Sequence, residues 1–316
     1  MSVPGGGRSL FPFPKTMQRQ LTPDFRDYEL IDSGAFEKLE RFGRFVTRRP
    51  EPQAIWHPSL PEEEWRRLAD ASFRRDARQE ERGEWRLAPK MPDRWTVEYA
   101  YGAMRLRMRL GLTSFKHVGI FPEQAANWDF IYDNCLALGG DGRTGAPRVL
   151  NLFAYTGGAT LAARAAGAEV THVDSVKQVV TWARENMEQS ALEGVRWIVE
   201  DALKFVQREV RRGNRYDGIL MDPPSYGRGP GGEVWKLENE LYPLVDLCAQ
   251  ALSDTPLFFL INGYTTGFSA SVLGNIARRC LVARYGGKVE ADELCLTVTT
   301  GGVLPCGTTA RWLPDA

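Results

Sequence analysis

The stretch VLNLFAYTGGAT, residues 149–160, decides the fold, because it joins a short apolar strand to a glycine-containing turn and the start of a helix. Residues 149–153 predict a buried strand, and residues 159–166 predict the following helix. Gly157 and Gly158 either let the backbone approach a ligand at the helix N-terminus or form an ordinary tight turn. The dinucleotide pattern GxGxxG is absent, which weakens the interpretation as a pyrophosphate site.

Beyond this stretch, short apolar segments alternate with amphipathic ones up to the end of the chain. The predicted strands are residues 169–173, 195–199, 216–221 and 256–261, and the predicted helices are residues 176–189, 203–210, 238–252 and 269–281. Two strands, at about 289–298 and 303–312, follow and form a hairpin. This order predicts an α/β fold with a doubly wound, mostly parallel seven-stranded sheet, whose ligand lies at the carboxyl ends of the strands.

The first third of the chain differs from the rest in composition. Residues 1–110 carry 21 basic and 17 acidic side chains, whereas residues 111–316 carry 19 and 23. Residues 95–110 alternate like a half-buried strand, with Arg105, Arg107 and Arg109 on one face. Residues 62–82 are charged, with apolar residues near helical spacing, and predict a surface helix or a partly mobile arm. We therefore expect a smaller β-rich N-terminal domain that ends near residue 115.

Two carboxylates follow consecutive predicted strands of the sheet. Asp174 ends the second strand and suits the hydroxyls of a ribose, although it could instead cap the next helix together with Ser175. Asp201 follows the third strand and suits an adenine amino group, with helix capping again the competing role. Because both lie at one edge of the sheet, beside the Gly157 turn, together they predict an adenosine site.

The fourth strand ends in Asp222-Pro223-Pro224-Ser225-Tyr226. Two prolines directly after a strand stop helix formation and stiffen the backbone at the ligand-bearing edge. A plain strand terminator is the alternative interpretation. Residues 227–236 predict a flexible loop, rimmed by Arg228, Trp235 and Lys236, that closes over a substrate or remains a solvated surface loop.

Composition excludes several classes of protein. With 316 residues, of which 43% are hydrophobic and 25% charged, the chain is not wholly disordered. Its apolar runs are too short to span a membrane, and residues 1–10 lack the apolar core of a secretory signal. Five cysteines without CxxC pairs and three separated histidines predict a reducing cytoplasm and no metal site. A net charge of zero argues against broad electrostatic capture of nucleic acid, and the absence of GxSxG argues against a hydrolase.

Four segments resemble motifs of class I S-adenosylmethionine-dependent methyltransferases: VLNLFAYTGGATLAA, HVDSV, VEDALKF and LMDPPSYGRGPGGEVWKLE. More narrowly, they resemble the bacterial large-subunit ribosomal RNA methyltransferases of the I and K types. GIFPEQ at residues 119–124 and LPCG at residues 304–307 extend the resemblance to residues 110–316. It implies a Rossmann-like methyltransferase domain over residues 116–316, an accessory or substrate-recognition domain over residues 1–115, and S-adenosyl-L-methionine as cofactor.

The resemblance also implies roles for individual residues. The methionine part of the cofactor would contact Phe121, Gln124, Asn151, Phe153, Ala154, Tyr155, Thr156, Gly157 and Gly158. Asp174 and Ser175 would hold the ribose, and Asp201 and Ala202 the adenine. Asp222 would face both the cofactor and the methyl acceptor, and Pro223, Pro224, Ser225 and Tyr226 would line the acceptor side as catalytic residues.

The sequence departs from the family pattern where the acceptor binds. Enzymes that form 5-methylcytosine attack the ring with a cysteine thiolate. The two positions known for that cysteine hold Ser225 and Asn262-Gly263-Tyr264 here, so covalent 5-methylcytosine chemistry is not expected. Enzymes that methylate exocyclic amines place an aromatic residue directly after Pro-Pro, where this chain has Ser225. A ring nitrogen such as guanine N7 needs only in-line placement, so a nitrogen acceptor is favoured.

We therefore expect a cytoplasmic methyltransferase that acts on RNA, most simply in ribosomal RNA processing, without a metal or a membrane. A homodimer is compatible with the sequence. The RNA-binding domain common at the start of the related enzymes is not evident in residues 1–110, so a protein or small-molecule substrate is an alternative. A nicotinamide-dependent oxidoreductase and a non-catalytic RNA-binding module are further alternatives.

Overall fold

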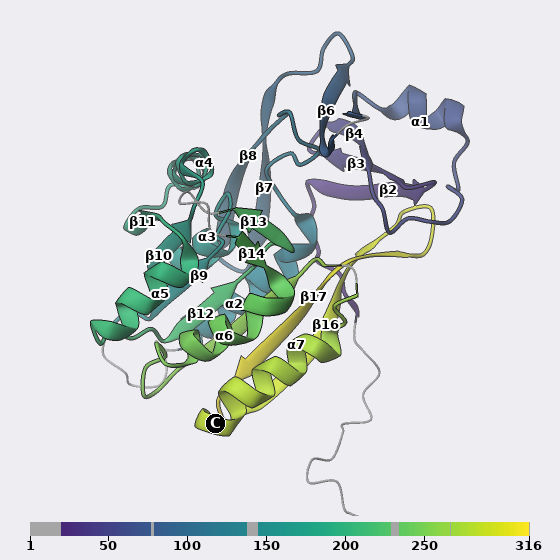
Figure 1. Cartoon of the computed structure of the whole chain (residues 1–316). Helices are drawn as coiled ribbons and strands as arrows, with labels where there is room; N and C mark the ends of the chain where they lie inside the picture. Colours follow the sequence, from purple (N-terminus) through teal and green to yellow (C-terminus); the bar gives the residue numbers. More distant parts are fainter. Residues whose placement is uncertain (1–19, 77–78, 138–144, 229–233, 266, 316) are drawn as a thin grey trace, which may run out of the picture.

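The computed structural model describes residues 20–76, 79–137, 145–228, 234–265 and 267–315. Residues 1–10, in which no secretory signal was expected, and residues 229–233 of the predicted loop lie outside these ranges. The chain forms one large sheet flanked by helices and a smaller group of strands beside it (Figure 1).

The large sheet has the predicted doubly wound topology. Its strands are β1 (Gln20–Leu21), β9 (Arg148–Leu152), β10 (Glu169–Asp174), β11 (Val195–Val199), β12 (Gly218–Met221), β15 (Phe258–Gly263), β16 (Lys288–Thr297) and β17 (Val303–Leu313). They lie in the order β1-β16-β17-β15-β12-β9-β10-β11. The strands from β9 to β15 pair in parallel, and β17 runs antiparallel to both β15 and β16. The predicted seven-stranded, mostly parallel sheet is thus confirmed, with the two-residue β1 added at one edge.

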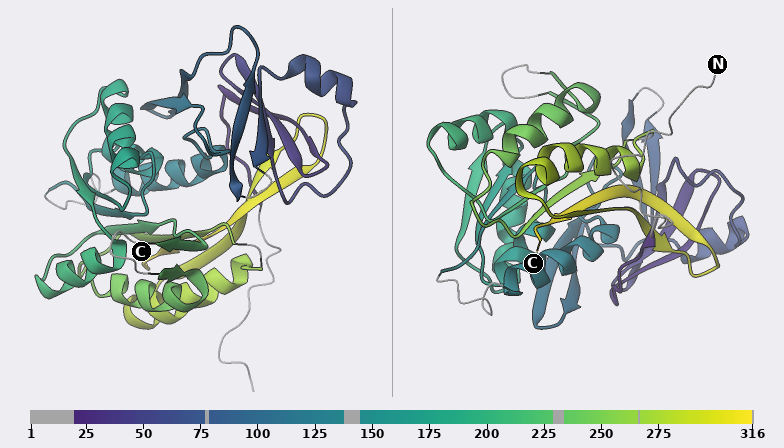
Figure 2. Two further views of the ribbon diagram at one scale, coloured as in Figure 1. Left: turned by 45° about the horizontal axis from the view of Figure 1, so that its top comes forward. Right: turned by 90° about the horizontal axis from the view of Figure 1, so that it is seen from below.

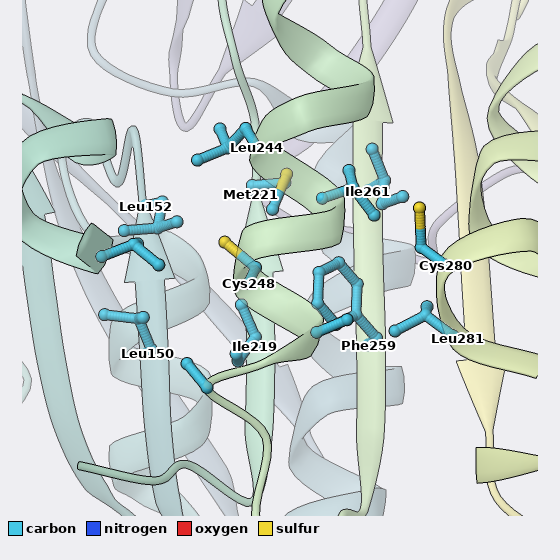
Figure 3. Close-up of a cluster of buried hydrophobic side chains, with 14 of the residues drawn as sticks. Leu150, Leu152, Ile219, Met221, Leu244, Cys248, Phe259, Ile261, Cys280 and Leu281 are labelled. Atoms are coloured by element: carbon cyan, nitrogen blue, oxygen red, sulfur yellow. The ribbon is translucent and has the colours of Figure 1, made fainter. Parts of the chain in front are cut away.

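Helices cover both faces of this sheet. They are α2 (Ala125–Ala137), α3 (Gly158–Ala165), α4 (Lys177–Gln189), α5 (Ala202–Arg211), α6 (Leu237–Ala249) and α7 (Ala270–Ala277). After α7, a π-helical turn (η2, Arg278–Val282) and a short helix (α8, Ala283–Tyr285) follow. One face packs on α5, α6 and α7: the sheet contributes Leu152, Met221, Phe259 and Ile261, and α6 contributes Leu244 (Figure 3). The opposite face packs on α2 and α3. Because both faces are covered, β12 and β15 are buried at every position.

The smaller group of strands lies in the chain between β1 and the other strands of the large sheet. It contains β2 (Tyr28–Gly34), β3 (Glu37–Phe42), β4 (Phe45–Pro50), β5 (Ala71–Asp76) and β6 (Gln79–Leu87), and the separate hairpin of β7 (Arg94–Tyr101) and β8 (Met104–Gly111). In β8 the predicted alternation is confirmed: Leu106, Met108 and Leu110 are fully buried, and Arg105 and Arg107 are exposed.

The expectation of a helix or mobile arm over residues 62–82 is wrong beyond its first turns. Helix α1 spans only Glu62–Leu68, and β5 and β6 then pair as antiparallel strands. The buried Phe73 lies opposite Trp85, with ring centroids 5.2 Å apart. This aromatic cross-strand pair stabilises the strand, and it overrides the helical spacing of the apolar residues.

The two groups of strands are in contact at the hairpin of β16 and β17. This hairpin leaves the large sheet and curves to β2, as Figure 2 shows in yellow and purple. Leu30 of β2 forms a bridge with Val298, and the amide of Thr299 donates a 2.8 Å hydrogen bond to the Leu30 carbonyl. The connection from β8 to α2 also reaches this hairpin, because its η1 turn (Pro122–Gln124) contacts β16.

Candidate active site

The turn from β9 to α3 carries two aromatic residues in left-handed backbone conformations. Phe153 has a φ of 54° and Tyr155 a φ of 49°. Such conformations cost about 1–3 kcal/mol for non-glycine residues and persist where the surroundings hold them. Here the Tyr155 amide donates a 3.0 Å hydrogen bond to the Asp174 carboxylate, so β10 holds the turn in place.

Each of the two glycines in this turn is required by the structure for a different reason. Gly157 has a φ of +92°, a conformation that L side chains rarely adopt. A Cβ atom on Gly158 would lie 2.4 Å from the ring of Trp128 on α2. The glycine pair therefore lets α3 begin directly against α2, and it leaves the preceding backbone at the carboxyl end of β9.

A cleft of about 470 Å³, counted with the solvent at its mouth, lies at this edge of the sheet. Ten residues predicted from the sequence line it: Phe121, Gln124, Asn151, Phe153, Ala154, Tyr155, Thr156, Gly157, Gly158 and Asp222. A lining of apolar and aromatic side chains with a few polar groups among them is typical of small-molecule and cofactor sites. Two of the ten residues are also tied to the framework: Asn151 donates to Thr160 at 2.9 Å, and the Thr156 hydroxyl donates to the Gly119 carbonyl at 2.6 Å.

Asp174 lies at the end of β10, beside the cleft lining. Its two oxygens accept hydrogen bonds from the amides of Tyr155, at 3.0 Å, and Val176, at 2.9 Å. Burial raises the pKa of Asp174, and these two hydrogen bonds oppose that rise. The side chain is not the N-cap of α4, because Val176 holds that position without a side-chain cap, and Ser175 is exposed.

Asp201 serves as the N-cap of α5. Its Oδ1 accepts a 2.9 Å hydrogen bond from the Lys204 amide, which is the capping role anticipated as the alternative. Ala202, the first residue of the helix, is buried. Asp201 and Ala202 follow β11, the neighbour of β10, but neither contributes to the lining of the cleft.

Asp222 lies directly after β12 and lines the cleft. Its Oδ2 is 3.4 Å from the donating Nε2 of Gln124, whereas its buried Oδ1 has no hydrogen-bond partner within the described part of the chain. Burial, and secondarily the negative charge of Glu123, raises the pKa of Asp222 to about 7. A carboxyl group with this pKa and an unpaired oxygen can exchange a proton with a bound molecule near neutral pH.

The four residues after Asp222 lead away from the cleft. Pro223 is buried, whereas Pro224, Ser225 and Tyr226 are exposed and outside the lining. The chain then pairs as two short strands, β13 (Tyr226–Arg228) and β14 (Val234–Lys236), where the sequence predicted a flexible loop. Trp235 of β14 donates a 2.6 Å hydrogen bond to the Pro224 carbonyl, and its ring centroid is 5.2 Å from that of Phe153. This hairpin therefore covers the strand end that carries Asp222.

Three residues around Asp222 were not assigned roles from the sequence. Glu123 lies in the 3-10 turn η1 (Pro122–Gln124) and is only 3% exposed, and Tyr264 follows β15 and accepts a 2.8 Å hydrogen bond from Gln124. Asn262, at the end of β15, lines the cleft. GIFPEQ contains Glu123 and could have drawn attention to it. Asn262 and Tyr264 were considered only as positions that lack a cysteine.

All five cysteines are free thiols in buried positions. None lines the cleft, and burial raises the pKa of the Cys135, Cys248, Cys280, Cys295 and Cys306 thiols. At the expected nucleophile position, Ser225 accepts a 2.7 Å hydrogen bond from the Thr265 hydroxyl. The geometry thus supplies no thiolate for attack on a pyrimidine ring.

Comparison with known proteins identifies the family. A family model described as "Conserved hypothetical protein 95" matches residues 138–232. The solved structure of the SAM-dependent methyltransferase from Agrobacterium tumefaciens is 38% identical, with 95% of each chain covered and a TM-score of 0.85. The chain belongs to the S-adenosylmethionine-dependent methyltransferases. This membership makes S-adenosylmethionine its cofactor and decides against a nicotinamide-dependent oxidoreductase.

The methyltransferase is also related to ribosomal RNA enzymes over part of its length. Ribosomal RNA large subunit methyltransferase K/L from Shewanella frigidimarina is 32% identical over 144 residues, which are 44% of this chain and 18% of that protein. Ribosomal RNA large subunit methyltransferase I from Aeromonas salmonicida is 37% identical over 86 residues, 26% of this chain and 22% of that protein. The methyltransferase thus spans about a fifth of the length of these relatives, and the similarity is distant and partial.

The described part of the methyltransferase lacks two structural features. Within the described ranges, no group of three or more His, Cys, Asp or Glu residues could hold a metal ion. No helix in the same ranges is long and apolar enough to cross a membrane.

Proposed function

We propose that this methyltransferase transfers a methyl group to a nitrogen atom of RNA, with ribosomal RNA as the most direct candidate. The partial similarity to ribosomal RNA large subunit methyltransferases supports RNA as the substrate. The unpartnered Oδ1 of Asp222 in the cleft is the observation that carries the choice of acceptor atom.

The residues at the carboxyl ends of β9, β10 and β11 fit the cofactor. The turn of residues 153–158, with Phe121 and Gln124 opposite, would hold the methionine part in the cleft, beside the buried Asn151. Asp174 would accept hydrogen bonds from the ribose hydroxyls with the lone pairs that its two backbone bonds leave, and Ser175 is adjacent. Asp201 and Ala202 would contact the adenine from the start of α5.

The cofactor supplies a methyl group that its sulfonium already activates. The protein therefore has to align the acceptor and to remove a proton from it. A nitrogen that carries a hydrogen can donate that hydrogen to Asp222 Oδ1, whereas a ring nitrogen with only a lone pair would face another acceptor. We therefore assign Asp222 as the group that orients an N–H acceptor and takes its proton. This assignment favours an amine or imino nitrogen over a ring nitrogen such as guanine N7, which the sequence had favoured.

The residues after Asp222 would form the acceptor side. Pro223 and Pro224 stiffen the backbone, and the bond from Trp235 to the Pro224 carbonyl adds the β13–β14 hairpin to this wall. Tyr226, with about half of its surface exposed, would stack on a base, and Ser225 lies beside it. Carbon methylation through a covalent intermediate is disfavoured because the cleft contains no cysteine.

We further assign residues 116–316 to catalysis and residues 1–115 to substrate recognition. The five buried free thiols support a reducing compartment, and we place the enzyme in the cytoplasm. Dimerisation stays a prediction, and analytical ultracentrifugation of the whole chain tests it.

Cofactor binding is tested by titrating S-adenosylmethionine in a calorimeter against wild type, Asp174→Ala and the exposed Asp254→Ala. Loss of charge-assisted hydrogen bonds worth about 1.5–3 kcal/mol predicts an affinity about 10- to 100-fold lower for Asp174→Ala alone. Equal affinities of all three proteins would contradict the placement of the ribose at Asp174.

The substrate is tested with labelled S-adenosylmethionine and an extract of cells that lack this chain. We expect label in RNA, sensitive to ribonuclease, and a methylated amine or imino nucleoside by mass spectrometry. Asp222→Ala serves as the inactive control. Label that survives ribonuclease would indicate a protein or small-molecule substrate, and 5-methylcytosine would contradict the assignment of a nitrogen acceptor.

A further inference from the structure

A chain of buried polar side chains connects Asp222 to the far end of β17. Gln124 donates through Nε2 to Asp222 Oδ2, at 3.4 Å, and to the Tyr264 hydroxyl, at 2.8 Å. Its Oε1 accepts from Asn127 Nδ2 at 2.9 Å and from Asn262 Nδ2 at 3.2 Å. Gln124, Asn127 and Asn262 are each less than 9% exposed, so water does not readily replace these bonds.

The charged end of this chain determines how each amide is turned. The guanidinium of Arg311 donates to Asn127 Oδ1 from Nε, at 2.9 Å, and from Nη2, at 2.7 Å. Because a guanidinium has donors only, Asn127 must present its oxygen to Arg311 and its NH₂ group to Gln124. Gln124 must then present its oxygen to Asn127 and its NH₂ group to Asp222.

We propose that Arg311 and Asn127 are positioning residues of the active site, which turn the NH₂ group of Gln124 toward Asp222 and so keep that carboxylate ready to accept a proton. This inference rests on the proposed role of Asp222. It extends the site to two residues that do not line the cleft.

If the side-chain amide of Gln124 were reversed, the ionisation of Asp222 would change. With the amide reversed, its carbonyl oxygen would face Asp222 Oδ2 and the Tyr264 hydroxyl, and two acceptors would meet in a buried space. The buried Glu123 carboxyl, which accepts a hydrogen bond from Tyr264, already acts on Asp222 with a like charge. Around Glu123 lie Lys38 and Glu40 of β3. A reversed Gln124 would add to the repulsion by Glu123, and Asp222 would hold its proton to a higher pH.

Asn127→Asp is the variant that tests this orientation. It keeps the shape of the side chain and its pairing with Arg311, but it offers Gln124 an oxygen in place of the NH₂ group. The matched control is Asn134→Asp on the same helix, since Asn134 donates a 2.7 Å hydrogen bond to the Phe130 carbonyl of its own helix and is not a member of this chain of bonds. Arg311→Met is the second variant, in case Asn127→Asp does not fold, because it removes the two short charged hydrogen bonds to Asn127 Oδ1 and leaves only the 3.5 Å bond from the Thr309 hydroxyl among the donors to this atom in the described part of the chain.

Nuclear magnetic resonance reads the result without any methyl acceptor. In wild type and Asn134→Asp we expect through-space contacts between the Gln124 Nε2 protons and the ring protons of Tyr264. Asn127→Asp and Arg311→Met should lose these contacts. We also expect the titration midpoint of the Asp222 carboxyl carbon to rise by about one pH unit in Asn127→Asp. Retained contacts with an unchanged midpoint would overturn the proposal.

Methyl transfer supplies a second, separable readout. A midpoint moved from about 7 to about 8 lowers the ionised fraction of Asp222, so transfer to cellular RNA should fall about fivefold at pH 7 and recover at pH 9. A loss that persists at pH 9 indicates a merely structural role and contradicts the proposal. If wild type transfers no label to RNA, the proposed substrate fails, and the resonance data still decide the role of Arg311 and Asn127.

Discussion

At the scale of single residues, Asp222 is a carboxyl group kept where its charge is unfavourable. Burial raises its pKa from 3.8 to about 7, and its Oδ1 has no partner in the described part of the chain. A buried polar atom without a partner costs stability and is retained where it has a function. The two prolines that follow leave the backbone little freedom to move this group into water.

Replacing Asp222 should therefore increase stability in a pH-dependent way. The folded chain holds the Asp222 proton up to about pH 7, whereas the unfolded chain releases it near pH 4. The contribution of Asp222 to the free energy of unfolding of wild type should therefore be most favourable below pH 4. It should decrease as the pH rises from 4 through 7. Each unit of pKa shift corresponds to about 1.4 kcal/mol of unfolding free energy, and partial access of Asp222 to solvent reduces the sum over the whole shift. We therefore expect Asp222→Asn to be about 2 kcal/mol more stable than wild type at pH 8.

Urea denaturation at pH 5 and pH 8 measures this effect, with Asp254→Asn as the exposed control. Asp222→Asn should gain less than half as much at pH 5 as at pH 8, because at pH 5 only the first part of the range between the two pKa values has been crossed, and the control should gain nothing at either pH. The same gain at both pH values would show that packing, and not ionisation, distinguishes the variant.

At the scale of secondary structure elements, the regular hydrophobic pattern of the sequence was sufficient to predict the elements of the large sheet. Apart from the short β13 and β14, the strands and helices from β9 to β17 were predicted within a few residues of their ends, because apolar runs alternate with amphipathic helices there. The resemblance to methyltransferase motifs, added to this order of elements, indicated ten residues that line the cleft. Elements that depend on distant partners were not predictable: β5 and β6 follow from the pairing of Phe73 with Trp85, and α2 from its packing against α3.

The polar chain behind Asp222 was missed for a related reason. Asn127 and Asn262 are 135 positions apart, and Asn127 and Arg311 are 184 apart. Each of these residues is ordinary in its local sequence. Only the folded sheet brings them together, so no local pattern indicates their contact.

Asp201, at the start of α5, has two competing roles: it caps the helix, or it also contacts the adenine of the cofactor. One pair of variants separates these roles. Asp201→Ala removes the cap and should lower the free energy of unfolding by about 1 kcal/mol, whereas Asp201→Ser keeps an acceptor for the Lys204 amide and should restore most of it. If Asp201 also contacts the adenine, both variants should bind S-adenosylmethionine more weakly in a calorimetric titration. Wild-type affinity in Asp201→Ser would leave capping as the role of this residue.

At the scale of the whole molecule, the two groups of strands share their interior. One buried cluster includes Leu30 and Phe42 of the smaller group, Trp128 of α2 and Leu296 of β16. Strand β1 belongs to the large sheet although it precedes β2 in the chain (Figure 1). A core that crosses the junction makes independent unfolding of the two parts costly, so we expect a single cooperative transition.

The tip of the β16–β17 hairpin offers a direct test of this coupling. The Thr300 hydroxyl donates a 2.7 Å hydrogen bond to Asp32 of β2, whose carboxylate also accepts from the Ser33, Ser59 and Leu60 amides and the Trp65 indole. Thr300→Val removes only the donor from the hairpin and should cost about 1–2 kcal/mol. Thr297→Val, exposed on the same hairpin, is the matched control.

Hydrogen exchange shows whether the loss of stability in Thr300→Val affects both the smaller group of strands and the large sheet. If the molecule unfolds as one unit, Thr300→Val should lower the protection of slow amides in β2 and in β10 by the same factor, because both open only in global unfolding. A loss confined to β2, with β10 as protected as in the control, would show that the smaller group opens by itself. In that case residues 1–115 would act as a separate unit that can move relative to the cleft while the methyltransferase stays folded.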